Sequence, residues 1–200
     1  MSTMLWVLFG GHLLGVVAAG LAGRSGMRPG LSVAAIAPAA TAGWAAARLV
    51  ADPEPVTSEL VWVQGLDLTI RFRIDDVALL MTLLVSGIGA LVFVYGVGYF
   101  ADDAPAGSKF PATLLGFSAA MLGLVWADSI WTLFIFWELT SITSFLLVGH
   151  KDLDADVRQA ARRALLITGV GGLVLLAGLL LLAAGAGSTD LTVLADTGAV

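Results

Sequence analysis

Residues 129–149 read SIWTLFIFWELTSITSFLLVG, and this stretch decides the class of fold. A helix of about 20 apolar residues crosses the roughly 30 Å hydrocarbon core of a bilayer. The rest of the chain is similarly apolar: 58% of its 200 residues are hydrophobic, 12% are charged, and the mean hydropathy is +0.95. A soluble domain has about 45–50% apolar and about 25% charged residues. The composition therefore predicts a polytopic membrane protein.

Six apolar stretches are spread along the chain. They predict an all-α polytopic membrane protein with about six transmembrane helices, in a single membrane domain over residues 1–200. The second stretch contains Pro38, which we expect to kink its helix because proline removes a backbone donor. The expected helices cover approximately residues 3–23, 31–50, 77–100, 110–127, 129–149 and 164–186.

The segment between the second and third helices has a different pattern. Apolar and polar residues alternate over about ten positions, which is typical of a half-buried strand. With Val61-Trp62-Val63 as a partner strand, the segment predicts a small β-hairpin over approximately residues 61–74. Its apolar face must lie on a neighbouring subunit or on the ends of the helices. The alternating apolar residues are Leu66, Leu68, Ile70, Phe72 and Ile74.

Basic residues in the loops predict the orientation, because cytoplasmic loops are enriched in Lys and Arg. Seven lie in the loops after the first, third and fifth helices, against Arg48, Arg71 and Arg73 on the other side. We therefore expect a multi-pass protein of the cell membrane, with its N-terminus, the hairpin and residues 190–200 outside. The seven are Arg24, Arg28, Lys109, Lys151, Arg158, Arg162 and Arg163.

Several classes of function find no support in the sequence. The chain has no cysteine and two histidines, which excludes thiolate ligands and leaves too few residues for a histidine-rich metal site. Its net charge of −5 does not favour nucleic-acid binding. No Walker loop, HExxH, Gly-x-Ser-x-Gly or dinucleotide fingerprint is present. We therefore expect no catalytic residue, metal site or cofactor.

Glu138 is the main candidate for a functional residue. It lies ten residues after Asp128 and twelve before His150, or about 15 Å and 18 Å from the two polar ends of its helix. A charge near the bilayer midplane costs about 2.5–3.5 kcal/mol on insertion scales. The carboxyl should therefore hold a proton or meet a cation, as a proton relay requires. The alternative is a neutral glutamic acid that donates one structural hydrogen bond between helices.

Weaker candidates surround Glu138 or lie at the helix ends. Thr140 and Ser141 either bond the carboxyl or water beside it, or bond their own helix backbone. His12 is either a relay member or a neutral imidazole between helices. His150 and Lys151, at the inner end of the fifth helix, either assist ion entry or anchor the helix at the interface.

The segment FWELTSITSFLLVGH, residues 136–150, resembles the large antiporter-like subunit of the Mrp monovalent cation/proton antiporters. That family shares its fold with the proton-pumping membrane subunits of respiratory complex I. The Leu-Thr-Ser that follows Glu138 is more similar to Mrp than to complex I subunits. The other matching strings are FRID (72–75), SGIG (86–89), YFADD (99–103), AMLGL (120–124) and ALLIT (164–168).

The resemblance implies a subunit of a multisubunit Na⁺/H⁺ antiporter in which Glu138 takes part in proton or cation movement. It also implies a larger bundle, with key lysines on later helices that this chain lacks. We therefore expect the chain to be the N-terminal part of such a bundle, from a split or truncated subunit, with other antiporter subunits as partners. The alternatives are a proton-translocating subunit of a complex I-type NADH-quinone oxidoreductase and a structural fragment that transports nothing.

Overall fold

A computed structural model describes residues 2–51, 54–63, 65, 68–100, 109–150 and 155–196. These residues form eight helices and one two-stranded antiparallel sheet. In chain order the elements are α1 (Ser2–Ala22), α2 (Met27–Ala34), α3 (Ile36–Val50), β1 (Val56–Val63), β2 (Leu68–Ile74), α4 (Asp76–Tyr99), α5 (Phe110–Val125), α6 (Ile130–Val148), α7 (Ala155–Ala186) and α8 (Leu191–Asp196).

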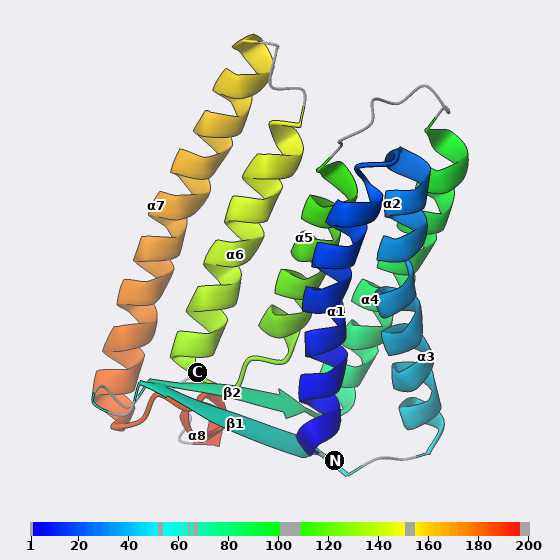
Figure 1. Cartoon of the computed structure of the whole chain (residues 1–200). Coiled ribbons are helices and arrows are strands. Elements are labelled where there is room, and N and C mark those ends of the chain that lie inside the picture. Colours follow the sequence, from blue (N-terminus) through cyan, green and yellow to red (C-terminus); the bar gives the residue numbers. More distant parts are fainter. Residues whose placement is uncertain are drawn as a thin grey trace.

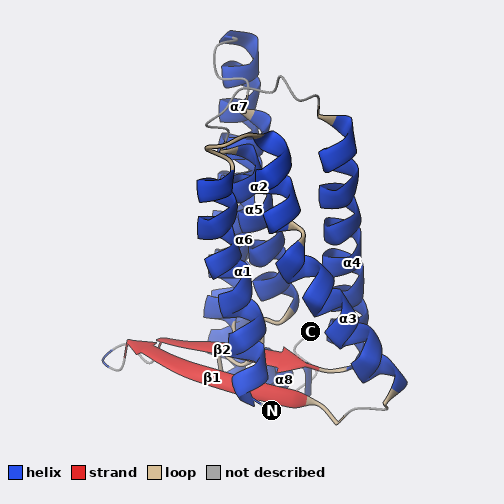
Figure 2. Ribbon diagram, turned by 45° about the vertical axis from the view of Figure 1, so that its right-hand side comes forward, coloured by secondary structure: helices blue, strands red, loops and turns tan. Residues whose placement is uncertain are grey.

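The long helices stand side by side, and the hairpin crosses one end of them (Figures 1 and 2). Helices α1 to α5 pack together, α6 packs on α5, and α7 packs on the outer side of α6. The start of α1, the hairpin and α8 all lie at the same end, which we call the hairpin end. The fold is therefore a helical membrane bundle with a small hairpin, as the sequence predicted.

Five helices are long and apolar enough to cross a membrane, when α2 and α3 are counted as one segment. The fourth expected span, α5, is apolar but has 16 residues, and a helix of that length extends about 24 Å. It lies between longer helices, so its ends are covered by protein as well as by any bilayer.

The second span differs from the single kinked helix that we expected over residues 31–50. It begins at Met27 and is divided at Ala35 into α2 and α3. Pro38 explains the break, because it has no N–H to donate to the carbonyl oxygen of Ala34, four residues earlier. The disruption therefore falls one turn before the proline.

Two other elements extend beyond their expected bounds. Strand β1 begins at Val56, five residues before the Val61-Trp62-Val63 segment, and pairs with β2 from Val56↔Ile74 onward. Helix α7 begins at Ala155 instead of residue 164, so its first part is a polar helix that continues into the span. The short helix α8 was not expected. Side-chain caps start two helices: Asp75 accepts from the Ala78 N–H at 2.9 Å, and Ser129 accepts from the Thr132 N–H at 3.2 Å.

The apolar face of the hairpin lies on the ends of the helices, which is one of the two placements we considered. Phe72 is fully buried at its centre. Its ring centroid lies 5.2 Å from that of Trp6, 5.7 Å from Phe9, and 5.8 Å from both Trp126 and Phe136. These tilted and edge-on arrangements are the favourable ones for aromatic pairs. One side chain of the hairpin thus contacts α1, α6 and the end of α5.

The outer edge of β2 is covered by the connection between α5 and α6. Arg73 donates its backbone N–H to the Trp126 carbonyl at 2.8 Å, and the Asp128 N–H donates to the Arg71 carbonyl at 3.0 Å. The same connection then pairs with the segment before α8, where the Ile130 N–H donates to the Thr189 carbonyl at 2.9 Å. These bonds satisfy backbone groups that an open strand edge would leave unpaired.

Replacing Phe72 should therefore destabilise the whole hairpin end. We predict that Phe72→Ala lowers the free energy of unfolding by about 3–5 kcal/mol, the usual range for a buried phenylalanine. Trp62→Ala is the matched control, because Trp62 is an aromatic residue of the same hairpin that is 60% exposed. Thermal unfolding of the purified membrane protein measures both. Equal midpoints for the two variants would contradict the central role of Phe72.

Candidate functional site

Glu138 lies in the middle of α6, eight residues after Ile130 and ten before Val148. It is the only ionisable residue of this helix. Helix α6 stands between α5 and α7 (Figure 1), and the Ser129 cap fixes where it begins. The Glu138 side chain is half-buried, so the structure places an ionisable carboxyl at mid-depth in an apolar helix pair.

The carboxyl of Glu138 rests against the backbone of α7. A Cβ atom built on Gly172 would overlap with Oε1 of Glu138, and it would lie 3.2 Å from the carboxyl carbon. Oε1 is buried and has no hydrogen-bond partner among the described residues. A buried polar atom without a partner carries a substantial free-energy penalty. The site is therefore incomplete as it stands, and its geometry depends on the absence of a side chain at Gly172.

The hydroxyls that follow Glu138 bond their own helix. Thr140 and Ser141 both donate to the Trp137 carbonyl, at 2.7 and 3.2 Å, and Thr143 donates to the Leu139 carbonyl at 2.7 Å. This is the backbone alternative that the sequence left open for Thr140 and Ser141. Their oxygen atoms can still accept a further bond.

A groove between α5, α6 and α7 adjoins these hydroxyls. It has a volume of about 510 Å³ and runs from Trp137, the neighbour of Glu138, to Val148 at the end of α6 away from the hairpin. Most of its lining is apolar, and four hydroxyls face it: Thr140, Ser141, Ser144 and Thr168. The groove thus leads from the loop end of the bundle toward the carboxyl.

The other predicted residues lie away from this groove. His12 is fully buried in α1, which packs mainly on α5 and α2. His150 lies just after α6, with its ring centroid 4.8 Å from that of Phe110. This contact suits the interfacial anchoring that we considered for it. Lys151 lies outside the described residues.

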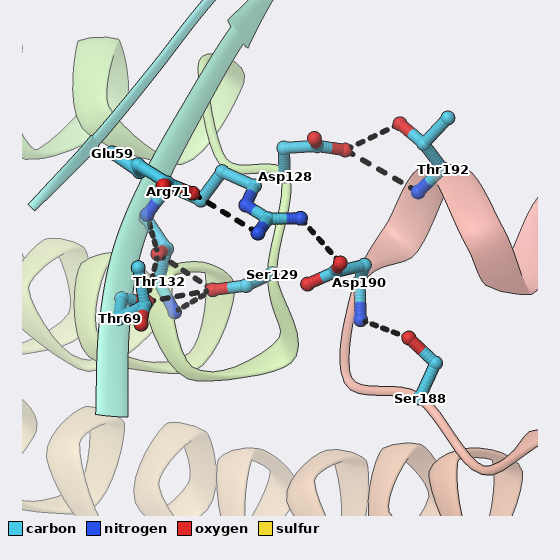
Figure 3. A network of polar contacts seen from close by, with 9 residues as sticks. All are labelled: Glu59, Thr69, Arg71, Asp128, Ser129, Thr132, Ser188, Asp190 and Thr192. Atoms are coloured by element: carbon cyan, nitrogen blue, oxygen red, sulfur yellow. Dashed lines mark hydrogen bonds and ion pairs between the residues drawn. The ribbon is translucent and has the colours of Figure 1, made fainter. Parts of the chain in front are cut away.

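A second polar cluster, at the hairpin end, was not singled out from the sequence (Figure 3). The Arg71 guanidinium pairs with Asp190 and, at 3.1 Å, with Glu59. Partial burial favours the neutral guanidinium, but the two carboxylates outweigh it, so the pKa of Arg71 is raised above its ordinary value. Asp128 accepts from the Thr192 hydroxyl at 2.6 Å. Charged residues on the polar face of the predicted hairpin were the signal available for this cluster.

The cluster at the hairpin end is a set of satisfied pairs that joins β2, the start of α6 and α8. Thr132 shows the same role, since its hydroxyl accepts from the Arg71 backbone N–H at 2.9 Å. Within the described ranges, no three His, Cys, Asp or Glu side chains are grouped as a metal site requires. The contrast between paired polar groups here and the unpaired oxygen of Glu138 favours Glu138 as the functional site.

Two protein-family models match this chain. Residues 61–110 match the model described as "NADH-Ubiquinone oxidoreductase (complex I), chain 5 N-terminus", and residues 127–199 match "NADH:quinone oxidoreductase/Mrp antiporter, TM". The second match contains Glu138 and Gly172. Among solved structures, the Mrp complex from Dietzia sp. DQ12-45-1b is similar to 94% of this chain, with a TM-score of 0.82 and 30% identity, over 20% of that chain. This chain has the sequence and fold of the N-terminal part of the large Mrp-type antiporter subunit.

Curated relatives of this Mrp-type chain are antiporter subunits. It is 41% identical over 137 residues to the probable K⁺/H⁺ antiporter A/B subunit of Rhizobium meliloti, and 41% identical over 129 residues to the Na⁺/H⁺ antiporter A1 subunit of Staphylococcus aureus. The alignments cover 68% and 64% of this chain, but 14% and 16% of those relatives. The archaeal membrane-bound sulfane sulfur reductase shares the fold, with a TM-score of 0.76 and 18% identity over 96% of this chain and 39% of that one.

The contact between Glu138 and Gly172 gives a direct test of the site geometry. Gly172→Ala should displace the carboxyl, because the new methyl group occupies the position of Oε1. The helix itself should tolerate alanine, which has the higher helix propensity. We predict a shift of the carboxyl infrared band of Glu138, identified by its loss in Glu138→Gln.

Gly169→Ala is the matched control on the same helix, because a Cβ there meets nothing within 4 Å. It should leave the band in place. Identical spectra for Gly172→Ala and Gly169→Ala would show that the carboxyl does not rest on Gly172.

Proposed function

We propose that this chain is part of a membrane subunit of a multisubunit monovalent cation/proton antiporter, and that Glu138 binds and releases the transported proton. The observation that carries the proposal is the buried, unpartnered Oε1 of Glu138 at mid-depth in α6, within a segment that matches the antiporter family. The named activities of the two curated relatives support the same reaction class.

The chemistry follows from the environment of the carboxyl. An ionised carboxylate in the bilayer interior is expensive, so the protonated form is favoured until a cation or water approaches. The groove lined by the hydroxyls of α6 and α7 supplies a route for water from the loop end. The helices α1 to α8 contain no lysine, so a lysine that pairs with Glu138 comes from outside the described helices. Proton transfer between the two groups would then be coupled to cation movement in the opposite direction.

The setting of this activity is part of the proposal. The chain functions in the cell membrane with its N-terminus and hairpin outside, as the distribution of basic residues indicates. It works with the remaining helices of the large subunit, and with the other subunits of the antiporter. Sodium is our first candidate for the cation. One relative is named for Na⁺ and the other for K⁺, so both ions belong in the test.

A proton-translocating subunit of a complex I-type oxidoreductase is the second candidate. The description of the model that matches residues 61–110 favours it. Two observations weigh more toward the antiporter: the 41% identity to antiporter subunits, and the higher identity to the Mrp complex (30%) than to the sulfane sulfur reductase (18%). Genes for quinone-reductase subunits beside this one would reverse that preference.

The test uses inverted membrane vesicles that carry the complete native gene set. A pH gradient is imposed, Na⁺ or K⁺ is added, and collapse of the gradient is followed. We predict that Glu138→Gln, which keeps the size and removes the titration, reduces cation-induced collapse to the level of vesicles without the gene set. Glu54→Gln is the control, because Glu54 is an exposed glutamate outside the helices. Wild-type transport by Glu138→Gln, at an equal protein level, would refute the proton-carrying role.

A further inference from the structure

A second group of unpartnered polar atoms lies inside the bundle, away from Glu138. His12 in α1, Ser86 in α4 and Ser118 in α5 are all buried. Nε2 of His12 and the hydroxyl oxygens of the two serines have no hydrogen-bond partner among the described residues. Buried polar atoms in native proteins nearly always have a partner, which is either protein or ordered water. Three such atoms therefore need a common explanation.

These residues interrupt apolar stripes at the same place. In α1 the stripe is Leu5, His12 and Ala19, and in α4 it is Leu79, Ser86 and Phe93, with a spacing of seven residues that keeps each set on one helix face. The outer members of both stripes belong to two apolar clusters, one toward the hairpin end and one toward the loop end. His12 and Ser86 occupy the position between these clusters.

Packing between neighbouring helices places Ser118 at the same level. Helices α1 and α5 run antiparallel, with Gly20 beside Ala112 and Gly15 beside Leu115. Three residues further toward the hairpin, the same pairing brings His12 level with Ser118. The hydroxyl of Ser118 points toward α4, because a Cβ on Gly89 would lie 3.4 Å from it. Gly89 is one turn from Ser86 on the same face.

The chemistry of the three groups is complementary to water. Nδ1 of His12 donates to the Leu8 carbonyl at 3.0 Å, which leaves Nε2 of the neutral ring as an acceptor. Each serine hydroxyl both donates and accepts. A groove of about 290 Å³ between α4 and α5 reaches Ser118, and a water molecule needs far less space together with two to four polar partners.

We propose that His12, Ser86 and Ser118 bind ordered water in the bundle interior, as a hydrated layer between the two apolar clusters. The layer lies on α1, α4 and α5, whereas the Glu138 site lies between α6 and α7. It is therefore a separate site, and it does not depend on the proposed transport function.

The experiment is a density map of the complete complex in lipid nanodiscs that shows ordered water at other buried polar groups. We expect a water peak within hydrogen-bonding distance of Nε2 of His12 and of at least one of the two serine hydroxyls. A layer without such a peak, or a direct hydrogen bond from a serine to His12, would overturn the inference.

A pair of variants tests the energetics of the same layer. The double variant Ser86→Ala/Ser118→Ala removes two partners of the water, so it should lower the thermal unfolding midpoint of the complex and remove the peak. Ser32→Ala is the control, since Ser32 is exposed on α2. A double variant that unfolds at or above the control temperature would overturn the inference, because deleting unpartnered hydroxyls from a dry layer weakens nothing.

Discussion

The bilayer interior offers no water to polar groups, and this constraint determines where every polar residue of the chain lies. Backbone groups are satisfied within helices, and the non-helical backbone is gathered at the hairpin end. There the edge of β2 pairs with the connection between α5 and α6, and that connection pairs in turn with residues before α8. The charged residues at this end are paired as well, with Arg71 between Glu59 and Asp190. The hairpin end is thus a closed polar structure built around the buried ring of Phe72.

Close packing on the two sides of α6 depends on glycine. On one side the ring of Phe136 fits against Gly123 of α5, where any Cβ would overlap with it. On the other side the carboxyl of Glu138 fits against Gly172 of α7. Small residues commonly allow such close approach between membrane helices. The two contacts have different consequences, because the first buries an aromatic ring in the core and the second holds a titratable group against bare backbone.

The sequence predicted the features that depend on local composition. Apolar stretches located the long helices, and period-2 alternation located β2. It gave less where no local pattern exists: residues 56–60 do not alternate, so the start of β1 was missed, and residues 155–163 are too polar to resemble a span although they continue α7. Glu138 was identified because it is the lone charge in its helix. The contact with Gly172 and the pair of Arg71 with Asp190 join residues far apart in the chain, and their geometry comes from tertiary packing.

Paired and unpaired polar groups separate the structural from the functional parts of this chain. The ion pairs and capped helix starts of the hairpin end are complete, so they need no ligand and rigidify one end of the bundle. Oε1 of Glu138 and the unpartnered atoms of His12, Ser86 and Ser118 lie at mid-depth in the bundle and are incomplete among the described residues. In a medium that supplies no alternative partner, such groups persist where something else completes them. A proton, a cation or water is the chemistry that fits Glu138, and water alone fits the neutral layer on α1, α4 and α5. The rigid hairpin end and the glycine contacts then serve to hold these incomplete groups in place.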